Sequence, residues 1–183
     1  MDASLKVVDK KAVLIQKNNM SHSQVLLGLV LQEADIPASV DTFDNRLLVQ
    51  KGVYLLQDVG VELGYPYSWY VRGPYSSRLA TDLFGFAESN SANSEMKGYA
   101  LGNETRERIG KVKDLLKLSD PSVDGRAKWL ELLASTLFLI RTKQAQSTDI
   151  PKIVAILQAN EKPFESENVA HALERLTYYG YVL

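Results

Sequence analysis

The sequence predicts a mainly α-helical fold with a short β element. Apolar residues recur three or four positions apart along most of the chain, and Gly, Pro and short polar runs divide these segments into ordinary helix lengths. Only residues 67–71 combine aromatic and β-branched residues as a strand does. We expect a helical core domain over residues 1–146 and a winged-helix-like C-terminal subdomain over residues 147–183.

Two helices are expected first. Residues 21–24 read Ser-His-Ser-Gln, a capping-box pattern in which the Ser and Gln side chains each bind the other's backbone amide, and an apolar-periodic helix should follow over 25–34. The second helix should cover 46–60, with Asp44 or Asn45 accepting its first free amides as the N-cap.

The next segment predicts a strand, a turn and a helix. After the strand at 67–71, the dipeptide at 73–74 is Gly-Pro, which favours the turn. Ser76 or Ser77 should then cap a third helix. The side chains that this helix should bury are Leu79, Leu83 and Phe84. We also expect four aromatic rings to be buried together: Tyr54, Trp69, Tyr70 and Tyr75.

The second half of the chain should be helical throughout. The polar run 88–98 is expected to be a surface loop, and 104–120 an amphipathic helix. Residues 126–143 are apolar on nearly every side, as in a central buried helix. Two helices, at 150–158 and 166–179, should close the chain. Their ending, with Tyr-Gly and an apolar terminus, is typical of a winged helix with a shortened wing.

Composition and motifs argue against several classes of function. With 21 basic and 22 acidic residues the net charge is −1, so no overall field attracts nucleic acid or an acidic membrane. The absence of Cys removes thiol chemistry, and neither His22 nor His171 has triad or metal-pair spacing. No phosphate-binding glycine motif is present. We therefore expect a cytoplasmic, non-catalytic protein with no cofactor, no metal and no membrane segment.

Two linked motifs carry a family resemblance. R-L-L-V-Q-K-G-V-Y-L-L starts at Arg46 and W-Y-V-R-G-P-Y-S-S-R-L-A starts at Trp69. Together they resemble the YwgA-like family of prokaryotic proteins and, more distantly, the SocA-like antitoxin (Panacea) domain. A segment beginning K-P-F at Lys162 matches more loosely. The sequence departs from the pattern at Arg72, where the family often has an aromatic residue. The resemblance implies a regulatory or antitoxin role.

Most of the aromatic density around the Gly-Pro dipeptide is expected to be packing, with a surface role for the residues beside it. Arg next to exposed aromatic rings suits a carboxylate, a phosphate or a cation–π contact. The candidate partner-binding residues are Gln50, Lys51, Tyr67, Arg72, Tyr75 and Arg78. A second basic cluster offers candidate nucleic-acid contacts: Arg106, Arg108, Lys111 and Lys113.

The preferred hypothesis is a prokaryotic regulatory or antitoxin-like module that binds a partner protein, such as a toxin or defence effector in a toxin–antitoxin or phage-defence locus. A DNA-binding transcriptional regulator is the first alternative, and an accessory subunit of a nucleic-acid-processing complex is the second. The last helix argues against base reading, because Glu167 and Glu174 would meet phosphates with the wrong sign.

Overall fold

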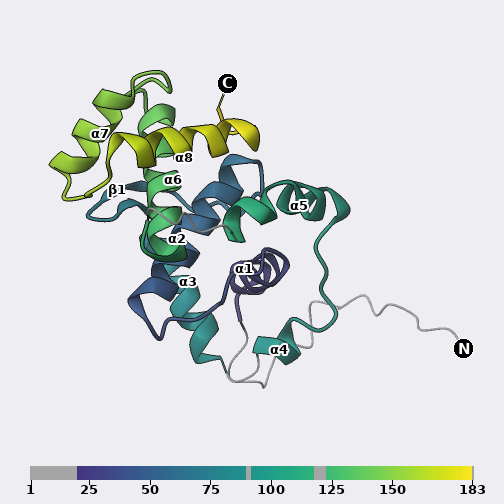
Figure 1. Cartoon of the computed structure of the whole chain (residues 1–183). Helices are drawn as coiled ribbons and strands as arrows, with labels where there is room; N and C mark the ends of the chain where they lie inside the picture. The colour runs from purple at the N-terminus through teal and green to yellow at the C-terminus, as the bar shows by residue number, and fades with distance from the viewer. Residues whose placement is uncertain (1–19, 90–91, 118–122, 183) are drawn as a thin grey trace, which may run out of the picture.

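The computed structural model describes residues 20–89, 92–117 and 123–182, and within them a mainly helical fold with one two-stranded antiparallel sheet (Figure 1). The elements follow in the order α1 (His22–Glu33), α2 (Phe43–Asp58), β1 (Ser68–Tyr70), β2 (Gly73–Tyr75), α3 (Ser77–Glu88), α4 (Ala92–Glu95), α5 (Asn103–Lys117), α6 (Gly125–Arg141), α7 (Ile150–Ala159) and α8 (Ser166–Tyr178). The predicted fold class is confirmed.

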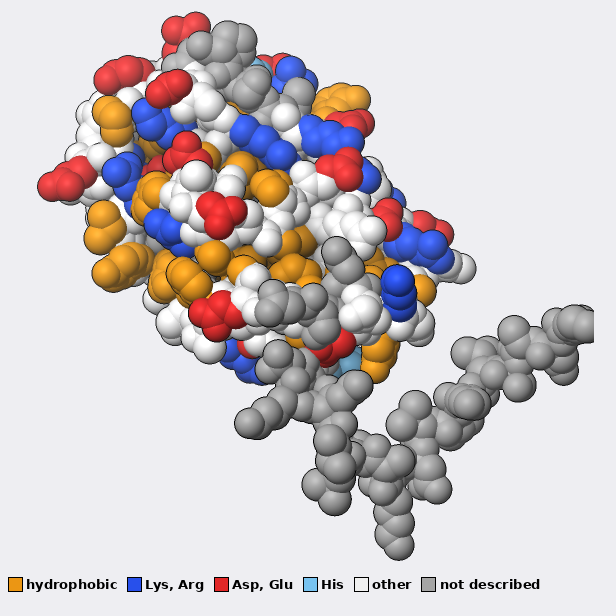
Figure 2. All heavy atoms as spheres, turned by 90° about the horizontal axis from the view of Figure 1, so that it is seen from below, with side chains coloured by type: hydrophobic (Ala, Val, Ile, Leu, Met, Phe, Trp, Pro, Cys, Tyr) orange, Lys and Arg blue, Asp and Glu red, His pale blue; other side chains and the backbone are white. Residues whose placement is uncertain are grey.

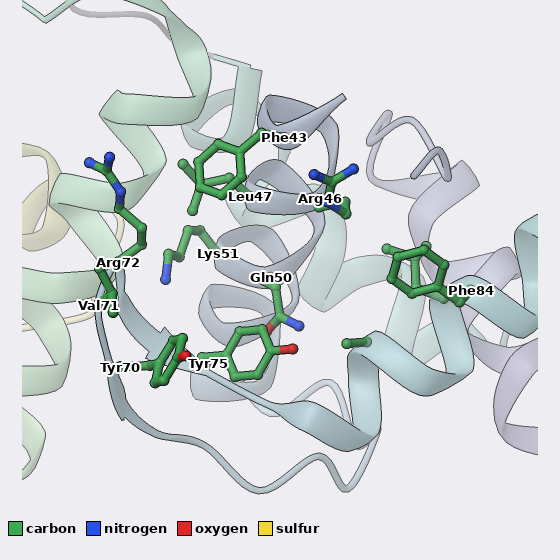
Figure 3. A pocket seen from close by; sticks show the side chains of 12 residues that line it. Phe43, Arg46, Leu47, Gln50, Lys51, Tyr70, Val71, Arg72, Tyr75 and Phe84 are labelled. Atoms are coloured by element: carbon green, nitrogen blue, oxygen red, sulfur yellow. The ribbon is translucent and has the colours of Figure 1, made fainter. Parts of the chain in front are cut away.

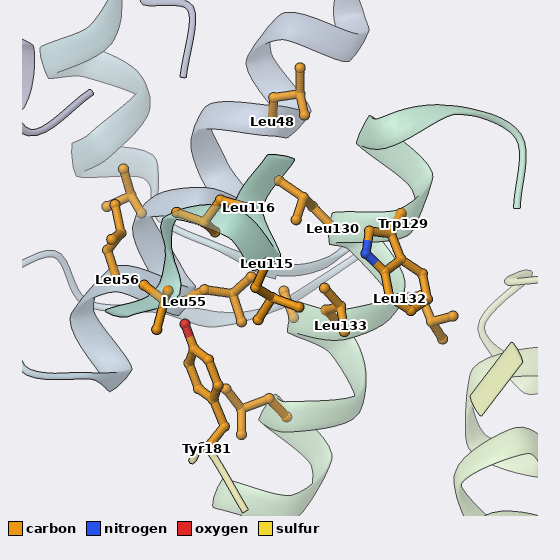
Figure 4. Packing of buried hydrophobic residues seen from close by; sticks show 14 of the residues in the cluster. Leu48, Leu55, Leu56, Leu115, Leu116, Trp129, Leu130, Leu132, Leu133 and Tyr181 are labelled. Atoms are coloured by element: carbon orange, nitrogen blue, oxygen red, sulfur yellow. The ribbon is translucent and has the colours of Figure 1, made fainter. Parts of the chain in front are cut away.

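Helix α6 forms the centre of the core, as its apolar sequence predicted. Every residue from Trp129 to Leu139 is buried, because α2 packs on one side of the helix and α8 on another. Figure 4 shows leucines of α2 and α5 meeting those of α6, with the ring of Tyr181 beside them. The buried apolar surface that stabilises the fold is therefore centred on α6, and the other elements pack around this helix.

Polar caps set the helix starts. Ser21 and Gln24 form the expected capping box, and Ser76 accepts a hydrogen bond from the Leu79 amide. The predicted cap of α2 is wrong. Thr42, rather than Asp44 or Asn45, accepts from the Asn45 amide, so the helix begins at Phe43 and gains a turn that the apolar pattern does not mark.

The Gly-Pro dipeptide is not the turn that the sequence suggested. The turn lies at Val71 and Arg72, and Gly73 and Pro74 belong to the second strand, where Trp69 pairs with Pro74. The strand was missed because Gly and Pro are poor strand formers. Here the short strand β2 pairs along one edge with β1, and it packs against α2 and α6.

The hairpin sends its aromatic rings to two opposite faces, since neighbouring side chains on a strand alternate. Trp69 turns toward Phe138 of α6, with ring centroids 5.6 Å apart. Tyr70 and Tyr75 share the other face, with centroids 5.5 Å apart. The expectation that these rings are buried together is therefore wrong: Tyr70 is 61% exposed. Phe84 was also wrongly expected in the core, where Phe86 lies instead.

The C-terminal helices α7 and α8 match the prediction, and they pack on each other and on α6. Within the described residues the strands are β1 and β2 alone, so the winged-helix detail is not confirmed, and the boundary at residue 146 stays a prediction.

The expected loop at 88–98 contains the short helix α4; the predicted end of α5 at Asp120-Pro121 lies outside the described residues. No helix in the described part of the chain is long and apolar enough to cross a membrane.

Gly73 is predicted to tolerate no side chain. Its φ is +79°, and an added Cβ would lie 2.2 Å from Ser135 Oγ of α6. Gly64 has a similar φ of +73° but open space around it, so it is a matched control. Gly64→Ala should cost about 1–2 kcal/mol from backbone strain alone, and Gly73→Ala about 1–3 kcal/mol more from overpacking. Urea unfolding of both variants measures the difference; equal losses would show that the hairpin moves freely away from α6.

Candidate functional site

A cavity of about 390 Å³ opens between α2, the hairpin and α3 (Figure 3). Its volume lies in the range of ordinary ligand pockets. Its lining residues are Phe43, Arg46, Leu47, Gln50, Lys51, Tyr70, Val71, Arg72, Tyr75, Ala80, Leu83 and Phe84. Nine of these twelve residues belong to the two motifs that carry the family resemblance, because α2 supplies one wall and the hairpin the other.

The pocket combines exposed apolar groups with unbalanced positive charge. Three of its lining side chains are basic and none is acidic. Four large hydrophobic side chains that line it are more than two-fifths exposed: Phe43, Tyr70, Val71 and Phe84. Exposed apolar groups that gather at one concave site, rather than scattering singly, mark a surface that binds another molecule.

Gln50 fixes the hairpin to α2 with a pair of hydrogen bonds. Its amide nitrogen donates to the Ser76 carbonyl at 2.9 Å, and its amide oxygen accepts from the Ser76 backbone N–H at 3.0 Å. Ser76 is also the N-cap of α3. One buried side chain therefore holds the junction between the second strand and the third helix, which sets the pocket's shape.

Lys51 lies at the bottom of the pocket and is only 1% exposed. Its Nζ donates a hydrogen bond of 2.6 Å to the Pro74 carbonyl, and Figure 3 shows the ammonium end turned toward the hairpin. Burial lowers the pKa of this ammonium to about 7; Glu131 acts in the opposite direction and Lys162 in the same one. No ion pair involves Lys51 within the described residues.

A buried ion pair supports the hairpin from behind. Lys162 Nζ lies 2.5 Å from Glu131 Oε1 of α6, and their side chains are only 1% and 3% exposed. The same ammonium donates to the Val71 carbonyl at 3.1 Å and lies 5.7 Å from the centre of the Trp69 ring. Burial lowers the pKa of Lys162, and its hydrogen bond with Glu131 acts against that shift. The loop after α7 is thereby joined to the hairpin turn.

Aromatic side chains fill the space between the hairpin and α6. Tyr54 contacts Tyr67 edge-to-face at 5.1 Å, and both Tyr54 and Trp69 contact Phe138. The Tyr67 hydroxyl donates to the Gln50 carbonyl, and burial raises the pKa of Tyr67 well above its usual value. This cluster is the structural part of the aromatic density, as the sequence predicted.

The pocket rim is basic and aromatic. Arg46 and Arg72 approach the Phe43 ring from different elements, each with its guanidinium carbon 5.9 Å from the ring centre. The sequence predicted Arg72 beside an exposed aromatic ring, and the structure places it, exposed, in the hairpin turn. Such stacked arginines keep free N–H donors for a carboxylate.

The structure brings four of the six predicted partner-binding residues into one place. Gln50, Lys51, Arg72 and Tyr75 line the pocket. Tyr67 lies behind the hairpin, and Arg78 is exposed on α3 outside the lining.

The basic residues of α5 are largely engaged within the molecule. Arg108 pairs with Glu104 and donates to the Gly60 carbonyl, and Lys113 pairs with Asp35 at 3.2 Å. Arg106 donates to Asn103, and Lys111 is exposed. On the face shown in Figure 2, basic and acidic side chains are interspersed rather than segregated. This arrangement does not favour a phosphate-binding surface.

Four residues important to the site were missed from the sequence. Phe43 precedes the expected helix start, and Phe84 was placed in the core. The pairing of Glu131 with Lys162 spans 31 positions, so no local pattern could indicate it. One signal was present: a Glu inside an otherwise apolar helix requires a partner when buried.

The described residues contain no cluster of His, Asp and Glu able to hold a metal ion. His171 stacks near Trp129 and accepts a hydrogen bond from Arg175, far in sequence from the pocket residues.

Fold and site together describe a mainly helical protein with a basic, apolar pocket walled by a β-hairpin. Comparison with protein-family models, curated proteins and solved structures found no match to this chain. The family resemblance therefore remains a prediction from the two motifs.

The low pKa of Lys51 predicts how stability changes with pH. Unfolded Lys titrates near 10.5, so between about pH 7 and 10 the unfolded state binds more protons than the folded state. Below pH 7 the folded protein bears the full free-energy cost of burying the charged Lys51 ammonium. This cost falls as the pH rises, because the ammonium deprotonates. Wild type should gain up to about 1 kcal/mol per pH unit relative to Lys51→Met. Denaturant unfolding of both proteins at several pH values tests this, and parallel curves would contradict it.

Breaking the Glu131–Lys162 pair should be more harmful than replacing it. Glu131→Leu leaves a buried ammonium without a counter-charge, which should cost about 3–5 kcal/mol. In the double variant Glu131→Leu/Lys162→Met no charge remains, and stability should return to within about 2 kcal/mol of wild type. Thermal and denaturant unfolding compare wild type, Glu131→Leu, Lys162→Met and the double variant. If the double variant loses as much as the sum of the single losses, the pair has no coupling.

Proposed function

We propose that this chain is a non-catalytic regulatory, antitoxin-like module that binds a partner protein through the pocket between α2 and the hairpin. The observation that carries the proposal is the pocket lining, in which three basic and four exposed hydrophobic side chains converge without a carboxylate. Aromatic residues beside arginine are the groups that dominate binding energy at protein interfaces. A toxin or defence effector encoded nearby is the kind of partner that the motif resemblance suggests.

The chemistry of the pocket defines the partner segment. Apolar walls require an aliphatic or aromatic anchor, and the excess of positive charge requires acidic groups next to it. Gln50 and Lys51 hold the hairpin against α2, and Lys162 holds the hairpin turn from behind, before anything binds. A preformed site loses less conformational entropy on binding, which supports recognition of a short segment.

DNA binding is the weaker candidate. Arg108 and Lys113 are paired internally, and the pocket's exposed rings suit an apolar ligand better than a phosphate backbone. A phosphate-driven complex would also weaken steeply with salt, so a duplex-binding titration at rising salt would separate the two functions.

Partner capture provides the test. Tyr70→Ala/Arg72→Ala removes two exposed rim groups and should leave stability within about 0.5 kcal/mol per change. Arg78→Ala, on exposed α3 outside the pocket lining, is the matched control. In pull-downs from the native host, wild type and the control should retain the same partner, and the double variant should lose it. Equal recovery by all three proteins of comparable thermal stability would remove the pocket from consideration.

A further inference from the structure

Lys51 is a buried basic side chain with no ion-pair partner among the described residues. The carboxylate nearest to it in electrostatic effect belongs to Glu131, but Glu131 is hydrogen-bonded to Lys162. The Pro74 carbonyl accepts one hydrogen bond from Lys51, while an ammonium group can donate three. Buried charges are ordinarily paired, because an unpaired charge in a low-dielectric site is costly. Lys51 departs from that rule at the bottom of an open pocket.

We propose that Lys51 forms an anion subsite at the pocket floor, which receives a carboxylate from the partner segment whose binding was proposed above. This inference rests on the proposed function and names the chemical group that the segment must present. The Lys51 ammonium supplies a single point charge that matches a monoanionic carboxylate, and the guanidinium groups of Arg46 and Arg72 lie at the rim beside Phe43. The carboxylate must stand beside an apolar group, because Leu47, Leu83 and Phe84 line the same space.

Binding at this subsite is coupled to proton uptake. Near pH 8 the Lys51 amine is mostly neutral in the free protein, since its pKa is about 7. A carboxylate at hydrogen-bond distance favours the ammonium form, so the complex takes up a proton as it forms. Affinity should therefore fall as the pH rises above 7.

The other groups around Lys51 do not reproduce this linkage. Glu131 of α6 and Lys162 after α7 act on Lys51 electrostatically. The charged and phenolic side chains that line the same pocket are Arg46, Arg72, Tyr70 and Tyr75. Comparison with Lys51→Met, which keeps all of these groups, separates their contribution from that of Lys51. Lys162 already has Glu131 as its counter-charge.

The test begins with a library of short random peptides displayed with free C-termini and selected against the full chain. Selected peptides are synthesised in three forms: unchanged, with a C-terminal amide, and with each Asp or Glu replaced by its amide. Loss of binding in one form shows whether the carboxylate comes from the chain end or from a side chain. Calorimetry in two buffers of different ionisation enthalpy then measures proton uptake.

We expect wild type to take up close to one proton at about pH 8, and to bind about tenfold or more weakly at about pH 8.5 than at 6.5. Lys51→Met should lose proton uptake and pH dependence, and Lys152→Met, exposed on α7, should keep both. Selected peptides that bind without proton uptake, or whose amide forms bind as well, would overturn the Lys51 subsite while leaving the pocket's function intact. If the library yields no peptide that binds at the pocket, both the Lys51 subsite and the proposed function are overturned. Because proton uptake is measured on wild type, the result stands even if Lys51→Met fails to fold.

Discussion

Two lysine ammonium groups hold the hairpin backbone in place, and the pocket depends on them. Lys51 binds the Pro74 carbonyl from α2, and Lys162 binds the Val71 carbonyl from the loop after α7. A two-stranded hairpin of this length is not stable alone in water. Its position therefore comes from side chains of distant segments, and its outer face becomes a pocket wall only while those contacts hold.

Burying two lysine side chains to hold the hairpin costs free energy. Lys51 and Lys162 are each 1% exposed, and burial lowers the pKa of both. Lys162 meets a carboxylate and the face of Trp69, so its charge is compensated. Lys51 has only a carbonyl among the described groups. A hydrophobic residue at that position would bury no charge, but it could not donate a hydrogen bond to the Pro74 carbonyl.

The hairpin also separates packing from recognition. Alternation along β1 sends Trp69 toward Phe138 and Tyr70 into the pocket, although the two rings are adjacent in sequence. Tyr67 belongs with Trp69 on the packing side, where its hydroxyl donates a hydrogen bond to the Gln50 carbonyl. One short aromatic stretch thus stabilises the core through one face and offers an exposed surface through the other.

Apolar periodicity and Ser caps are local signals, and from them the sequence places α1, α5, α6, α7 and α8 close to where the structure has them. It also selected Gln50, Lys51, Arg72 and Tyr75, since motif and composition mark them directly. Three features could not be predicted locally: which face each hairpin ring occupies, the close approach of Gly73 in β2 to Ser135, and the contact of Lys162 with Val71, 91 positions away. These depend on contacts between distant segments, and a side chain's burial, charge state and partner are properties of such contacts rather than of its neighbours along the chain.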